Sequence, residues 1–103
     1  MATKSRKKEK ISKFDAADFL RSKADVIAYL QACIDEAGDD ASVIAEALGA
    51  IARARGGISK VAREAGLTRE GLHKALAKNG NPSLGTFLKV TRAVGVRMVA
   101  KAA

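Results

Sequence analysis

The stretch 58–77 has the residue spacing that two short crossed helices require, and this spacing constrains the fold more than any other feature of the chain. Ala62 is small enough to let a second helix approach the first. Gly66, four residues later, suits the turn because a positive φ costs glycine little. Thr68 can cap the second helix through its side-chain oxygen. Residues 58–77 are therefore predicted to form a helix-turn-helix.

The second helix of this pair would bury one face and expose the other. Apolar sides that can close the pair come from Val61, Ala65, Leu67, Leu72, Ala75 and Leu76. The residues that remain outward are Arg69, Glu70, His73 and Lys74, whose side chains can pair with base edges in a major groove. Because many helical proteins join two such helices without touching DNA, spacing alone leaves DNA binding and a structural role equally open.

Charge is divided unevenly along this chain, whose formal net charge is +8. Residues 1–13 carry six basic residues and one acidic residue, and residues 51–103 carry eleven basic residues and two acidic ones. Residues 14–50 carry eight acidic residues against two basic ones. The basic half contains the predicted helix-turn-helix and favours a polyanionic partner. The acidic middle suits a basic partner, or it is simply a solvated surface.

Length and composition favour one small all-α domain. The chain has 103 residues, only 4% of them aromatic, and much of its apolar content is alanine, which favours close helix packing over strands. It has no apolar run long enough for a membrane span and no secretory signal. The single cysteine, Cys33, cannot form an intrachain disulfide, which fits a reducing cytoplasm. We expect five to six helices.

Capping residues and apolar periods divide the chain into helices. Residues 1–13 are predicted to be a disordered basic tail that either contacts phosphates or only solubilises the chain, and the helical domain spans 14–103. Phe19 and Leu20 are expected to hold a first short segment to the core. Longer helices follow, one starting at Ser22 and ending at Gly38, and one running from 39–42 to Gly56.

The last predicted helix begins at a Ser83 cap and ends at Gly95. Its inward residues are expected to be Leu84, Phe87, Leu88, Thr91 and Val94. Residues 96–100 are predicted to form either a short strand or an extended docking segment.

The sequence offers no catalytic, metal or cofactor site. His73 is the only histidine, and no cysteine or carboxylate stands at metal-ligand spacing around it. The paired and single glycines fall in turns rather than in a phosphate-binding loop. We therefore expect a protein that is not an enzyme and needs no cofactor.

Three stretches together resemble the antidote (antitoxin) proteins of type II addiction modules. They are ALGAIARARGG, VAREAGLTREGL and GNPSLGTFLKV, within a similarity that covers about residues 14–100. The resemblance is to the HigA-like type, which carries a helix-turn-helix of the Xre, or lambda-repressor-like, kind. It implies a homodimer that binds double-stranded operator DNA, represses its own operon and neutralises a small basic toxin of the RelE/ParE/HigB type.

The resemblance also implies positions for the DNA contacts. Arg69 and Glu70 would open the recognition helix, with His73 and Lys74 one turn further, and Arg69 is expected to be the chief base reader. The alternative for Arg69 is that it pairs only with Glu70 or with a phosphate. Phosphate contacts are expected from Ser59, Lys60, Thr68, Lys78, Asn79 and Asn81. Family members commonly carry serine at Gly71 and tyrosine at His73, so the operator cannot be inferred from them.

The acidic middle is the hypothetical toxin-binding surface, with Asp35, Glu36, Asp39 and Asp40 as its residues. Two alternatives stay open beside the antitoxin. One is a stand-alone Xre-type repressor without a toxin partner. The other is a protein-interaction module in which the helix-turn-helix is only a scaffold.

Overall fold

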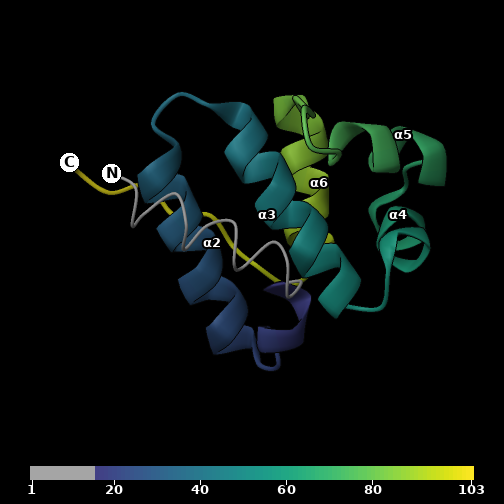
Figure 1. The fold of residues 1–103 in the computed structure, drawn as a ribbon, viewed down its shortest axis with the longest axis horizontal. Coiled ribbons are helices and arrows are strands. Elements are labelled where there is room, and N and C mark those ends of the chain that lie inside the picture. The colour runs from purple at the N-terminus through teal and green to yellow at the C-terminus, as the bar shows by residue number, and fades with distance from the viewer. Residues whose placement is uncertain (1–15) are drawn as a thin grey trace.

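The described residues of the computed structural model, 16–103, contain helices and no strand. A 3-10 helix, η1 (Ala16–Phe19), precedes five α-helices (Figure 1). These are α2 (Lys23–Ala37), α3 (Ala41–Ala54), α4 (Ile58–Ala65), α5 (Arg69–Ala75) and α6 (Leu84–Ala93). The all-α prediction is confirmed. The predicted basic tail, residues 1–13, lies outside the described residues.

Local capping explains where most of these helices begin. The Ser22 hydroxyl accepts from the Asp25 backbone N–H at 3.1 Å, and the Asp25 carboxylate accepts in return from the Ser22 N–H. The Asp40 carboxylate accepts from the Ser42 N–H and caps α3, and Ser83 caps α6 through the Thr86 N–H. Each cap satisfies an N–H group that the first helical turn leaves unpaired.

Helix α3 runs through the centre of the domain and contacts η1, α2 and α4 (Figure 1). Its buried residues surround the helix instead of forming one stripe, and they are Ala45, Ala47, Leu48, Gly49, Ala50, Ile51 and Ala52. At Gly49 an added Cβ would lie 3.2 Å from the Leu76 carbonyl oxygen, so glycine allows the end of α5 to approach closely. The small residues of α3 therefore set how near its neighbours can pack.

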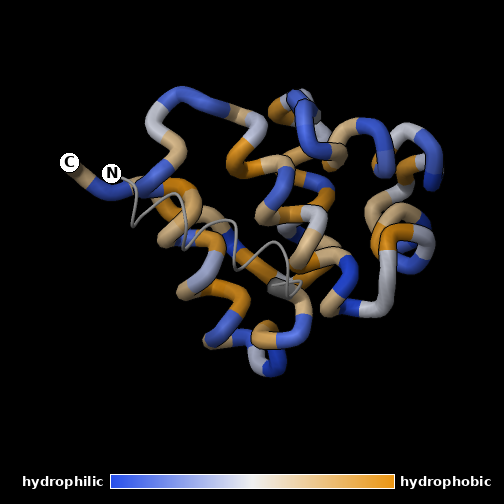
Figure 2. The backbone as a smooth tube through the Cα atoms, viewed as in Figure 1, coloured by the Kyte–Doolittle hydropathy of each residue, from blue (hydrophilic) through white to orange (hydrophobic). Residues whose placement is uncertain are grey.

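Ile27, which the apolar period of the helix after Ser22 places toward the core, is 51% exposed, and three further predicted core residues are exposed as well. Phe19 is 65% exposed, Leu84 72% and Leu88 44%, whereas Leu20 is buried as predicted. The inward face of α6 is instead formed by Phe87, Val90, Thr91 and Val94. Helix α4 packs against α6, and Val90 belongs to the same core cluster as Val61 and Ala62 of α4. Figure 2 shows how hydrophobic and hydrophilic residues alternate along the backbone.

The C-terminal residues form no strand, so that alternative is wrong. The Val96 N–H donates to the Thr91 carbonyl oxygen at 2.8 Å, and residues 96–103 continue without helix or strand. They lie against α2, where Val96 and Met98 line a depression together with Leu30 and Ile34. The docking alternative therefore describes this segment. Within residues 16–103 no helix combines the length and apolarity that a membrane crossing needs.

Candidate nucleic-acid interface

Helices α4 and α5 are joined by three residues whose geometry explains the sharp turn. Gly66 ends α4 with φ 74° and ψ 31°, the left-handed conformation that favours glycine. The Leu67 N–H returns to the Ala62 carbonyl oxygen at 2.8 Å. The Thr68 hydroxyl then accepts from the Gly71 N–H at 3.0 Å and starts α5. The predicted turn at Gly66 and the predicted cap at Thr68 are both confirmed.

Helix α5 is held to the domain along one face. Leu72 and Leu76 are buried, and the Leu76 carbonyl approaches Gly49 of α3. Exposure of the rest of α5 follows from this attachment, because the core contacts occupy positions four residues apart on a single face. All ten predicted DNA contacts are exposed: Ser59, Lys60, Thr68, Arg69, Glu70, His73, Lys74, Lys78, Asn79 and Asn81.

Two of these exposed residues lie together across the turn. The Arg69 Nε donates to the Ser59 hydroxyl oxygen at 2.9 Å, which joins the first turn of α5 to the first turn of α4. Within the described residues Arg69 forms no ion pair with Glu70, which was one of the alternatives. Lys60 is engaged differently, since its Nζ lies 3.0 Å from Glu64 one turn along α4. An exposed pair of this kind is weak and can be exchanged for a phosphate.

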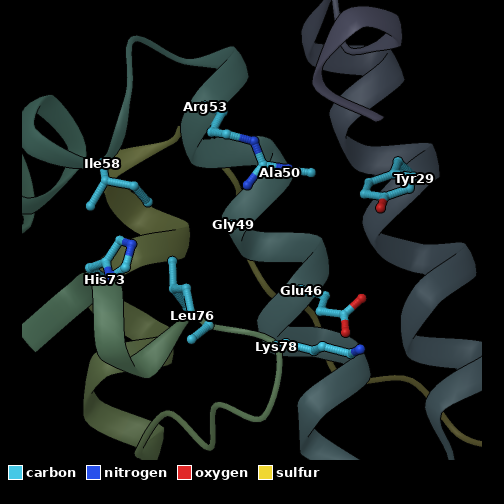
Figure 3. A pocket seen from close by; sticks show the side chains of 10 residues that line it. Tyr29, Glu46, Gly49, Ala50, Arg53, Ile58, His73, Leu76 and Lys78 are labelled. Atoms are coloured by element: carbon cyan, nitrogen blue, oxygen red, sulfur yellow. The ribbon is translucent and has the colours of Figure 1, made fainter. Parts of the chain in front are cut away.

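His73 and Lys78 face a groove of about 510 Å³ beside the helix pair. Figure 3 shows His73 at the end of this groove nearest Ile58, and Glu46 and Lys78 at the other end. Arg53, from the last turn of α3, also lines the groove. Arg53 was not among the predicted site residues, although it belongs to the basic run Arg53-Ala-Arg55 that precedes the Gly56–Gly57 turn.

The groove extends to Tyr29 of α2. Burial raises the pKa of the Tyr29 hydroxyl above its ordinary value, and the neighbouring Cys33 raises it further. Tyr29 is therefore neutral at physiological pH and offers the groove a hydroxyl rather than a charge. Among residues 16–103 no group of histidine, cysteine and carboxylate side chains could hold a metal ion.

Gly71 lies where the cap of α5 leaves little space. A Cβ added there would be 2.8 Å from the Thr68 hydroxyl oxygen, the atom that accepts from the Gly71 N–H. A side chain at this position would therefore need the cap to shift. This contact is a physical reason for glycine inside a short helix, where it otherwise costs roughly 1 kcal/mol relative to alanine.

Exposed charges of opposite sign lie on different parts of the domain. The four acidic residues proposed for the toxin surface are exposed at the end of α2 and in the α2–α3 link, where Figure 2 shows hydrophilic chain. Asp40 also has a structural role, because its carboxylate caps α3. From α4 to α6 the exposed charges are mainly basic: Lys60, Arg63, Arg69, Lys74, Lys78, Lys89 and Arg92.

Comparison with known proteins assigns the family. Residues 10–102 match the model of a family described as probable addiction module antidote protein, and the chain belongs to that family. It is also 43% identical, over 89 residues, to an uncharacterised protein of Haemophilus influenzae, an alignment that covers 86% of this chain and 89% of that protein. No solved structure matches the chain.

Proposed function

We propose that this antidote protein binds operator DNA through α4 and α5, neutralises a small basic toxin of the RelE/ParE/HigB type and represses its own operon. The observation that carries the DNA-binding half is the attachment of α5, which is buried at Leu72 and Leu76 and exposed at Arg69, Glu70 and Lys74. In a two-fold dimer, two copies of α5 would enter successive major grooves. Phosphate contacts from Ser59, Lys60, Thr68, Lys78, Asn79 and Asn81 would hold the protein in register.

The DNA-binding half is tested by comparing two arginine variants. Arg69→Ala is expected to weaken binding to the DNA upstream of the gene by about 1–3 kcal/mol, because the fork to a guanine is lost, and to relax sequence preference at one position. Arg97→Ala removes the same charge from the exposed C-terminal segment beside α2 and is the matched control. Fluorescence anisotropy at fixed salt, on this duplex and on a scrambled one, measures both effects.

An equal loss from Arg69→Ala on both duplexes would make Arg69 a backbone contact. An equal loss of affinity from Arg69→Ala and Arg97→Ala would show that Arg69 contributes only its positive charge. The affinity of the wild-type protein should also fall steeply as salt is raised, since counterions are released when basic residues meet phosphates.

The toxin-binding half rests on the exposed acidic surface at the end of α2. Neutralising Asp35, Glu36 and Asp39 together (D35N/E36Q/D39N) is expected to slow association with a basic toxin by on the order of 10-fold. Asp40 is left unchanged, because its loss would remove the cap of α3 and confuse stability with binding. Surface plasmon resonance with the product of the adjacent gene measures the rate.

The control for this triple variant is E64Q/E70Q, which removes both negative charges of the basic half. Unchanged association of D35N/E36Q/D39N would place the toxin elsewhere. A protein that shifts its upstream DNA but never co-purifies with the adjacent gene product would instead favour the stand-alone repressor. Failure to shift that DNA at low salt would favour the protein-interaction module.

A further inference from the structure

We propose that Ser59 is a positioning residue for Arg69, and that its hydroxyl joins a DNA phosphate to the base-reading guanidinium. This inference rests on the DNA binding proposed above. The observation behind it is the 2.9 Å hydrogen bond from Arg69 Nε to the Ser59 hydroxyl oxygen. The two residues are ten positions apart in sequence and come from different helices, so the contact exists only because the turn brings the starts of α4 and α5 together.

The choice of atoms leaves both side chains able to bind DNA. Arginine carries N–H donors on Nε and on both Nη atoms, and the bond to Ser59 uses only Nε. The two Nη atoms remain available for parallel hydrogen bonds to the O6 and N7 of a guanine. The end of the guanidinium can therefore read a base while its side stays attached to α4.

The Ser59 hydroxyl can serve two partners at once. It accepts from Arg69, and a hydroxyl has its own O–H donor in addition to its acceptor lone pairs. That O–H can be donated to a phosphate oxygen at the start of α4, where unpaired backbone N–H groups also favour an anion. Donation to the phosphate polarises the hydroxyl and so couples the backbone contact to the base contact.

Neighbouring side chains do not provide an equivalent link. The Thr68 hydroxyl accepts from the Gly71 N–H as the cap of α5, and the Lys60 ammonium pairs with Glu64 along α4. Ser59 alone, among the described polar residues of the helix pair, bonds across the turn to the predicted base reader. Holding Arg69 in place before DNA arrives reduces the side-chain freedom lost on binding.

The test is a double-mutant cycle with a conservative rescue. Ser59→Ala is expected to weaken binding to the cognate duplex by about threefold to tenfold, the loss that follows from freeing one long side chain. It should reduce the preference over a scrambled duplex as well. Ser59→Thr, which keeps the hydroxyl, is expected to stay within about twofold of the wild-type protein. In an R69A background, Ser59→Ala should have a much smaller effect than in the wild-type background.

A second readout needs no DNA. In the free protein, hydrogen exchange of the Arg69 Nε–H, followed by NMR, should be slowed in the wild type and in S59T and fast in S59A. The positioning role would be overturned if the losses of affinity from S59A and R69A were additive and the Arg69 Nε–H of the wild type exchanged fast. The proposed DNA binding would remain intact in that case. Absence of DNA binding by the wild-type protein with the Nε–H still protected would overturn the proposed function, and the positioning role with it.

Discussion

Leu48→Ala is expected to lower the free energy of unfolding by about 2–5 kcal/mol, because the substitution leaves a cavity around a fully buried side chain. Leu48 has no exposed surface and lies on α3, the helix that contacts η1, α2 and α4. Small domains are stabilised by only about 5–15 kcal/mol in total, so this one substitution removes a large part of the free energy of unfolding. Urea denaturation followed by circular dichroism measures it.

Leu84→Ala is the matched control for Leu48→Ala. Leu84 is 72% exposed on α6, and the same chemical change there should alter the free energy of unfolding by no more than about 0.5 kcal/mol. Similar losses from the two variants would contradict the central position of α3. A single transition should persist in both variants, because α3 is shared by the acidic and basic halves.

Gly80→Ala is expected to lower the free energy of unfolding by about 1–3 kcal/mol, through overpacking of the turn that follows α5. Gly80 is buried, and its N–H donates to the Ala77 carbonyl oxygen at 2.7 Å. An added Cβ would collide with the Ala75 carbonyl oxygen and lie 2.9 Å from that of Ala77. Backbone atoms cannot turn away as a side chain can, so the end of α5 must shift. The same urea titration detects the loss.

Gly85→Ala separates this collision from the general effect of removing a glycine. A Cβ at Gly85 would find its nearest neighbour, the Ser83 hydroxyl oxygen, at 3.9 Å. Since Gly85 lies in α6, alanine there should be neutral or stabilising by up to about 1 kcal/mol. A Gly80→Ala variant as stable as Gly85→Ala would show that the turn can relax around the methyl group.

Features that depend on a few neighbouring residues were predicted well. The caps at Ser22, Thr68 and Ser83 and the turn at Gly66 are local, and the structure confirms them. The prediction of which helix face is buried was less accurate where that face depends on the neighbouring helices. On α6 the predicted and observed stripes share Phe87, Thr91 and Val94 but differ at Leu84, Leu88 and Val90, because the sequence does not say on which side α4 lies.

The candidate DNA interface could likewise be predicted from the sequence only in part. Exposure of Arg69, Glu70 and Lys74 follows from the period of one short helix, so the sequence indicated it. The Ser59–Arg69 hydrogen bond depends on how two helices cross, and no local pattern encodes that angle. The groove that brings His73 and Lys78 together with Arg53 is lined by residues of four helices, α2 to α5, and of the chain after α5, which again requires the tertiary arrangement.

The alanine-lined surface of α3 also determines which inherited changes the domain can tolerate. Four alanines of this helix are buried: Ala45, Ala47, Ala50 and Ala52. Their side chains are already small, and the atoms packed around them leave little space for a larger side chain. Enlargement to valine or leucine would force neighbouring backbones apart. Substitution at these four positions is thereby confined to the smallest residues, whereas exposed surfaces such as the end of α2 place no such limit on side-chain size.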